Sequence, residues 1–261
     1  MQTVKKLVLV IIVFGAMAAF LISTGKWYAA VVGPVQAVFG QNAANRVDDL
    51  GQRSNQIATK AGDLTDRILD GILGDKVDPA AVNQALASVP TTPDVRIPPY
   101  ARAAFGNSWT DVDHNGCDTR NDVLNRDLTA VIHTTGDCVV RTGRLADPYT
   151  AKTINFLRGS GTSSAVQIDH IVPLGLAWSM GAYSWDDGRR LAFANDQNGL
   201  LAVDGPTNGS KSDKGPGRWL PANRAYQCVY AAKFVYVVVE YGLSMAADDK
   251  SAIGGALSTC P

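Results

Sequence analysis

The segment over residues 169–213 carries the side chains of this chain that are best suited to chemistry. It reads Asp169-His170-Ile171-Val172-Pro173, then Asn198, then Asn208-Gly209-Ser210-Lys211-Ser212-Asp213. An imidazole titrates near neutral pH, so His170 can take a proton from water as a general base. Asp169 and Asn208 offer hard oxygen ligands, for which Mg²⁺ is the expected ion and Mn²⁺ or zinc the alternative. A base and a metal of this kind can hydrolyse a phosphodiester.

These motifs resemble those of the HNH, or ββα-metal, nucleases, including the HNH domain of RNA-guided CRISPR nucleases. The resemblance implies that Asp169 and Asn208 bind one divalent metal and that His170 is the general base. It implies that Asn198 holds the metal loop through hydrogen bonds and that Lys211 contacts a phosphate. It also implies cleavage of DNA, or of RNA, to ends that carry 5′-phosphate and 3′-hydroxyl groups.

From about residue 100 to residue 261 the chain is also similar to a more specific group. These are secreted actinobacterial HNH proteins, whose domain forms the C-terminal part of GmrSD-type restriction enzymes as well. The similarity is carried by islands at residues 109–120, 147–150, 177–178, 193–196 and 219–221.

The elements that must position the motif indicate an α+β fold. They are strands over 165–171 and 199–203, an inserted helix over 185–194 and a helix from residue 209 onward that carries Lys211. This is a ββα-metal hairpin with an insertion, embedded in a disulfide-bonded domain. Residues 222–241 are strongly apolar but include Lys233 and Glu240, so we expect a buried helix there rather than a membrane span.

All four cysteines lie in the same part of the chain, at Cys117, Cys138, Cys228 and Cys260. An even number of cysteines in an exported domain indicates two disulfides, for which three connectivities exist. We favour pairing of neighbours, Cys117 with Cys138 and Cys228 with Cys260. A zinc site of four cysteines is disfavoured because no C-x-x-C pair is present.

A second polar cluster, Asp111-Val112-Asp113-His114-Asn115-Gly116, copies the opening of an EF-hand calcium loop, with Asp122 at its twelfth place. A true EF-hand has a bidentate Glu at that place and a helix on each side. Since Asp is shorter and Cys117 is expected in a disulfide, calcium over 111–122 is the less favoured interpretation.

The charge balance restricts how nucleic acid could be bound. With 24 basic and 24 acidic side chains the formal net charge is zero, so a footprint on nucleic acid must be local. Basic residues that flank the motif are Arg141, Arg144, Lys152, Arg158, Lys211, Lys214 and Arg218. We expect phosphate contacts from Lys211, Arg218 and Arg120, because a guanidinium can clamp phosphate bidentately. The alternatives are solvated surface charge and, for Arg120, an ion pair with a nearby Asp.

The N-terminus predicts export. Lys5 and Lys6 precede an uncharged run over 7–23. The length of this run lies between the about 20 residues that a membrane span needs and the about 7–15 apolar residues of a cleavable signal peptide. The apolar continuation over 27–39 favours an anchor. The lysines before the run favour an outward-facing domain. The expected location is therefore the membrane, facing outside the cytoplasm, or secretion if residues 1–40 are cleaved.

Residues 41–89 form a helical spacer in this interpretation. Apolar residues recur at threes and fours, at Leu50, Ile57, Ala61, Leu64, Ile68 and Ile72. A short heptad pattern over 47–72 could support weak self-association. A helix that only acts as a spacer, or that packs on the following domain, is favoured over self-association. Prolines at 90, 93, 98 and 99 predict a linker over 90–99, before a nuclease domain over 100–261.

Together these features predict a metal-dependent endonuclease with little sequence specificity, since no base-reading module accompanies the motif. Two alternatives remain: a catalytically silent, membrane-tethered module that binds nucleic acid, and a nuclease effector or toxin. The presence of Asp169, His170 and Asn208 together favours the enzyme over the silent module.

Overall fold

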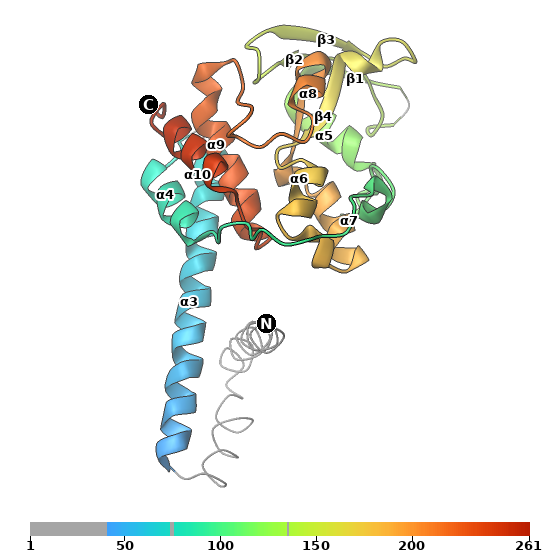
Figure 1. Cartoon of the computed structure of the whole chain (residues 1–261). Coiled ribbons are helices and arrows are strands. Elements are labelled where there is room, and N and C mark those ends of the chain that lie inside the picture. Colours follow the sequence, from blue (N-terminus) through green and yellow to red (C-terminus); the bar gives the residue numbers. More distant parts are fainter. Residues whose placement is uncertain (1–40, 74–75, 135) are drawn as a thin grey trace. The chain divides into compact units, whose positions relative to one another are not determined.

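The structure is a computed structural model that describes residues 41–73, 76–134 and 136–261 (Figure 1). The chain divides into two compact units, Met1–Asp66 and Arg67–Pro261. The predicted signal or anchor over 1–40 lies outside the described residues. Within the described ranges, no helix is both long enough and apolar enough to cross a membrane.

The amphipathic pattern of the spacer produces the helix α3 (Gln41–Leu73). Of its apolar residues, Leu50 is exposed in the first unit and Ile68 is buried in the second. A second helix, α4 (Pro79–Ser88), starts where the side chain of Asp78 accepts hydrogen bonds from the amides of Ala80 and Ala81. This cap satisfies two of the amides that a helix leaves free at its first turn. Residues 41–73 and 79–88 are thus helical, within the range where the sequence predicts a helical spacer.

The proline-rich segment over 90–99 contains no helix or strand, and it is fixed to the second unit. Thr92 N donates to Met245 O (3.1 Å), and Met245 N donates to Pro90 O (2.9 Å). Further along, Trp178 Nε1 donates to Pro98 O (2.8 Å). The segment therefore runs along the surface of the second unit and is part of it, whereas the sequence predicted a linker that only precedes the domain.

A three-stranded antiparallel sheet lies before the motif, and the sequence interpretation did not include it. It consists of β1 (Leu128–His133), β2 (Val140–Ala146) and β3 (Thr153–Leu157), in that spatial order, with α5 (Thr119–Asp127) before it. Apolar side chains of the sheet and α5 form one core with those of the strands that carry the motif, among them Leu124, Leu145, Phe156, Ile168 and Ala202. This core gives the motif strands a fixed support.

The motif strands are β4 (Val166–His170) and β5 (Leu200–Asp204), which pair antiparallel. Between them lie α6 (Leu174–Ser179) and α7 (Asp187–Asn195). The described part of this unit also contains four short 3₁₀ turns: η2 (Arg102–Phe105), η3 (Ser163–Ala165), η4 (Ala182–Ser184) and η5 (Gln197–Gly199). Both strands and the inserted helix match their predictions.

The helix after β5 departs from its prediction. This helix, α8 (Gly205–Lys211), begins before residue 209 because Asp204 caps it, accepting from Thr207 N, and Pro206 occupies its first turn. A Cβ on Gly205 would lie 2.0 Å from Ser164 O, so glycine lets the start of α8 approach η3 closely. The end of the helix, not its middle, therefore carries Lys211.

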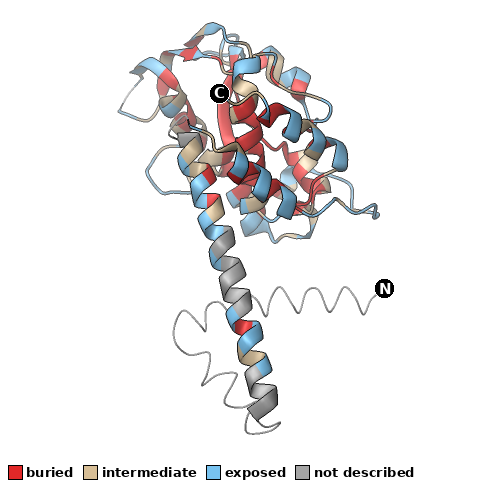
Figure 2. Ribbon diagram, turned by 90° about the vertical axis from the view of Figure 1, so that its left-hand side faces the viewer, coloured by how far each residue is buried: buried red, intermediate tan, exposed pale blue. Residues whose placement is uncertain are grey.

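The C-terminal helices α9 (Arg224–Glu240) and α10 (Ala247–Leu257) lie beside α4 (Figure 1). Most of α9 is buried, including Phe234 and Val238 (Figure 2). The prediction of a buried helix within 222–241 is confirmed.

Candidate active site

Asp169, near the end of β4, is a buried carboxylate with both oxygens engaged. Tyr149 Oη donates a hydrogen bond to Oδ2 (2.5 Å), and Lys211 Nζ donates to Oδ1 (2.8 Å). Burial raises the pKa of the Tyr149 hydroxyl well above its usual range, and the charge of Asp169 adds to this effect. The phenol therefore stays a hydrogen-bond donor at neutral pH.

Lys211 joins α8 to β4 inside the protein. Its side chain is fully buried, and Nζ donates to His170 O (2.7 Å) as well as to Asp169. Burial lowers the pKa of Lys211, whereas the charge of Asp169 raises it. The structure thus corrects the phosphate contact that we expected for Lys211, because its ammonium group is enclosed and already bonded.

His170, the last residue of β4, is partly buried and held in one orientation. Its Nε2 lies 2.9 Å from Ala194 O. A carbonyl can only accept, so Nε2 carries the proton and Nδ1 is the basic nitrogen. The ring of Trp109 stacks on the imidazole, with centroids 6.3 Å apart and planes at 17°. Burial lowers the pKa of His170 to about 4, so the ring is neutral at pH 7.

Asn208, on α8, faces the same space as the two strand residues. Its Nδ2 donates to Gln167 Oε1 (3.0 Å), which leaves the amide oxygen of Asn208 as the free ligand atom. A pocket of about 230 Å³ is lined by Tyr100, Ile168, Asp169, His170, Pro173, Leu174, Asn208, Ser212 and Asp213. The three residues that the sequence singled out first are therefore brought together.

Two residues of this site were missed by the sequence interpretation. Asp213 lines the pocket, and glycine at 175 makes room for it, since a Cβ there would lie 2.7 Å from Asp213 Cγ. The position of Asp213 at the end of the motif was an available signal. Tyr149 lies in the island over 147–150, but nothing in the sequence pairs it with Asp169.

Asn198 does not line this pocket. It belongs to η5, and its backbone N donates to Asp196 Oδ1 (3.0 Å). Its side chain makes no hydrogen bond with any residue that the structure describes. The structure therefore offers no contact for the supporting role that the family resemblance implied for Asn198.

The two arginines expected to bind phosphate are placed differently. Arg120 is partly buried and donates to Val166 O (3.0 Å) and Ser163 O (3.4 Å), so it holds the start of β4 instead of facing a ligand. This corrects both interpretations of Arg120, the phosphate clamp and the ion pair. Arg218 is exposed and lines a second pocket of about 450 Å³ together with Lys214, Asp248 and Asp249.

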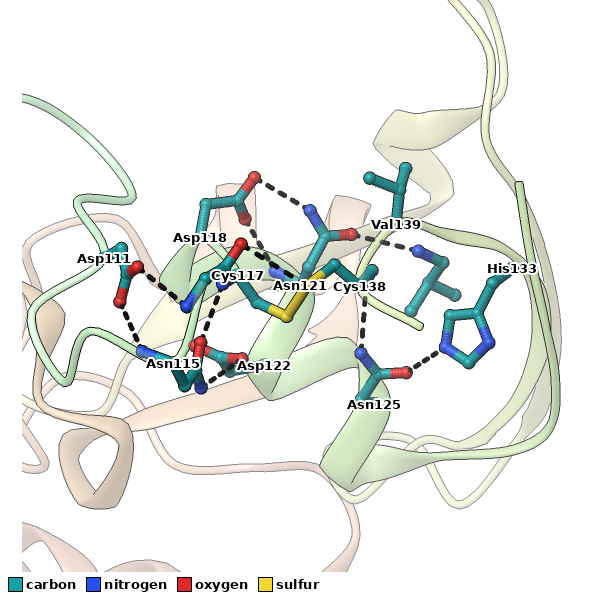
Figure 3. The surroundings of a disulfide bond; sticks show 12 residues. Asp111, Asn115, Cys117, Asp118, Asn121, Asp122, Asn125, His133, Cys138 and Val139 are labelled. Carbon is teal, nitrogen blue, oxygen red and sulfur yellow. Dashed lines mark hydrogen bonds between the residues drawn. A yellow bond between two sulfur atoms is a disulfide. The ribbon is translucent and has the colours of Figure 1, made fainter. Parts of the chain in front are cut away.

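Both disulfides pair as predicted. Cys117 bonds Cys138, with Cα atoms 5.2 Å apart, and Cys228 bonds Cys260, with Cα atoms 5.0 Å apart. The first joins the loop before α5 to the segment before β2 (Figure 3), and the second joins α9 to the end of the chain.

The loop over 111–122 is closed by its own hydrogen bonds (Figure 3). Asp111 Oδ2 accepts from Gly116 N (3.0 Å), while Asn115 Nδ2 donates to Asp113 Oδ2 and to Asp122 Oδ1 (both 3.1 Å). In the described ranges no three His, Cys, Asp or Glu side chains are placed to hold a metal ion. Calcium at this loop stays a prediction from the sequence alone.

Comparison with known proteins gives the family. Residues 118–254 match the C-terminal domain of GmrSD restriction endonucleases, and the chain belongs to this family. It is also 37% identical over 163 residues to an uncharacterized secreted protein of Arthroderma benhamiae, a match that covers 62% of this chain and 76% of that protein. No solved structure matches the chain. The family relation confirms the GmrSD resemblance and indicates a nuclease-related role, with nucleic acid as the partner.

Proposed function

We propose that residues 100–261 form a metal-dependent endonuclease of the HNH type, acting on DNA, with RNA as the alternative polymer. The observation that carries this proposal is that Asp169, His170 and Asn208 line one pocket. Asp169 and His170 lie on β4, which pairs antiparallel with β5, and Asn208 lies on the helix that follows β5, the order of elements expected for a ββα-metal hairpin.

The oxygen ligands that the pocket offers fit one hard divalent cation. Asp169 accepts one hydrogen bond at each oxygen, and an ionised carboxylate has about four lone-pair positions, so lone pairs remain for a metal. The amide oxygen of Asn208 is the second protein ligand. Mg²⁺ suits such a site because it keeps several waters and completes its shell with substrate phosphate. When bound, the ion would stabilise negative charge on the phosphate oxygens.

The charges around the pocket also affect how the metal binds. Those of Asp169 and Lys211 cancel, which leaves the carboxylate of Asp213 as the net negative charge among the side chains that line the pocket. A bound phosphodiester adds a negative charge at the pocket. We therefore expect metal and substrate to bind cooperatively.

His170 acts as the general base in this proposal. Nδ1 takes a proton from a water molecule as the water oxygen bonds to phosphorus and the bond from phosphorus to the leaving oxygen breaks. The bond from Nε2 to Ala194 O holds the neutral ring in the tautomer whose Nδ1 is the basic nitrogen, and it stabilises the imidazolium that forms. A base with a lowered pKa is available over a wide pH range but has less driving force for proton transfer.

The place of action is proposed to be outside the cytoplasm. Two disulfides fit an oxidising compartment, where such bonds persist. The name of the relative from Arthroderma benhamiae includes the word secreted. Residues 1–40 would then anchor the enzyme, facing outward, or be removed on export.

The test of this function uses the oxidised full-length chain with plasmid DNA and, separately, with RNA. We expect cleavage with Mg²⁺ or Mn²⁺ and none with EDTA. One observation favours the silent binding module instead: both oxygens of Asp169 are already engaged. Binding of either polymer without cleavage by any divalent metal would establish that alternative.

A further inference from the structure

We infer that Tyr149 is a positioning residue of this site: its hydroxyl fixes Asp169 so that the carboxylate presents its remaining lone pairs to the divalent metal. The inference rests on the proposed function. It concerns a residue that lies outside the HNH motif and does not itself line the pocket.

The contact is direct and enclosed. Tyr149 is fully buried, and its only polar side-chain atom lies 2.5 Å from Asp169 Oδ2. Its ring packs edge-on against Trp219, with centroids 5.0 Å apart, and against Tyr230, with centroids 5.9 Å apart. Because packing fixes the ring, the direction of its hydroxyl group toward Asp169 is fixed as well.

The backbone around Tyr149 is held on two sides. The buried carboxylate of Asp147 accepts from Thr150 N (2.9 Å) and from Asp204 N (3.0 Å), which ties this turn to the end of β5. On the other side, Asn223 N donates to Tyr149 O (3.0 Å). These bonds place the phenol against β4 whether or not a ligand is present.

Tyr149 and Lys211 have different tasks at the same carboxylate. Lys211 supplies opposite charge at Oδ1, from the end of α8, whereas Tyr149 supplies a neutral donor at Oδ2. The terminal torsion of an aspartate side chain is broad, so one anchored oxygen alone leaves the carboxylate free to turn. Loss of the hydroxyl should therefore disturb orientation while leaving the charge pair in place.

Tyr230 provides a matched control. It is fully buried in the same aromatic cluster, and its ring contacts both Tyr149 and Trp219. Its hydroxyl, unlike that of Tyr149, has no hydrogen-bond partner among the described residues. Tyr230→Phe thus removes a hydroxyl of equal burial from the same cluster without removing a hydrogen bond to Asp169.

The experiment measures Mn²⁺ binding by electron paramagnetic resonance, with the oxidised full-length chain, in the wild type, Tyr149→Phe and Tyr230→Phe. DNA cleavage is followed in parallel, at a temperature where circular dichroism shows all three proteins folded. Loss of a partner of a ligating carboxylate typically weakens metal binding about 10–100-fold. We expect a weakening of this size in Tyr149→Phe, with recovery of cleavage at higher Mn²⁺, and unchanged binding in Tyr230→Phe.

The outcomes separate this inference from the proposed function. Wild-type Mn²⁺ affinity in Tyr149→Phe would overturn the positioning role, while the nuclease function would stand if the wild type still cuts DNA. An equal loss of Mn²⁺ affinity in Tyr230→Phe would also overturn the positioning role, since the packing of the aromatic cluster would then explain the loss in both variants. A wild-type protein that neither binds Mn²⁺ nor cuts would overturn the proposed function, and the inference with it.

Discussion

Lys211 Nζ and Asp169 Oδ1 lie 2.8 Å apart, in an ion pair whose side chains are 0% and 6% exposed. Two charges lose their hydration at such a place, and each is stable there only because of the other. The pair connects the helix that carries Asn208 to the strand that carries His170. One contact thus fixes the spacing of the proposed ligands and also stabilises the fold.

Removal of the cation should destabilise the whole unit. We predict that Lys211→Met lowers the free energy of unfolding by about 3–5 kcal/mol, because Asp169 is left as an uncompensated buried charge. Urea denaturation measures this loss. The control is Lys214→Met at an exposed lysine, where a change within about 0.5 kcal/mol is expected. Equal stability of the two variants would show that Asp169 does not need its partner.

The lowered pKa of His170 makes a prediction about pH. Burial moves this pKa from 6.5 to about 4, so between these values the unfolded chain binds a proton that the folded protein excludes. The contribution of His170 to the free energy of unfolding is complete above pH 6.5 and decreases as the pH falls toward 4. Unfolding in EDTA across this range should be less pH-dependent in His170→Ala than in the wild type. Identical pH dependence would contradict the lowered pKa.

The two disulfides should contribute comparably to stability. Their cysteines are 21 and 32 residues apart in sequence, and closing loops of this length stabilises a protein by about 3–4 kcal/mol in the chain-entropy model. We predict a loss of this size for Cys117→Ser with Cys138→Ser, and likewise for Cys228→Ser with Cys260→Ser. Calorimetry of the two double variants measures it, and a melting temperature equal to that of the wild type in either would refute the estimate.

The sequence predicted the elements whose signals are local. The strands at 166–170 and 200–204, the inserted helix and the buried C-terminal helix follow from short patterns of apolar residues. The start of α8 was misplaced although its signals, Asp204 as a cap and Pro206 in the first turn, are also local. That error came from turn chemistry that was present in the sequence and not used.

The partners of the site residues could not be predicted in the same way. Lys211 bonds a carboxylate 42 residues away, and Arg120 bonds a carbonyl 46 residues away. Whether a basic side chain faces solvent or a buried acceptor depends on which segments pack together, and local patterns in a single sequence do not show this. The same holds for Tyr149, in the turn between β2 and β3, and Asp169, on β4.

The proposed nuclease site depends on His170 as its base and on a divalent metal. Its most direct test compares plasmid cleavage by the oxidised wild type, His170→Ala and His133→Ala, with Mg²⁺ and with EDTA. His133 is the control because its Nε2 bonds Asn125 Oδ1 (2.7 Å), away from the pocket. We predict cleavage by the wild type and His133→Ala with Mg²⁺ only, and a rate lower by about 10²–10⁴-fold in His170→Ala. Cleavage by His170→Ala at the wild-type rate, or by the wild type in EDTA, would contradict the account.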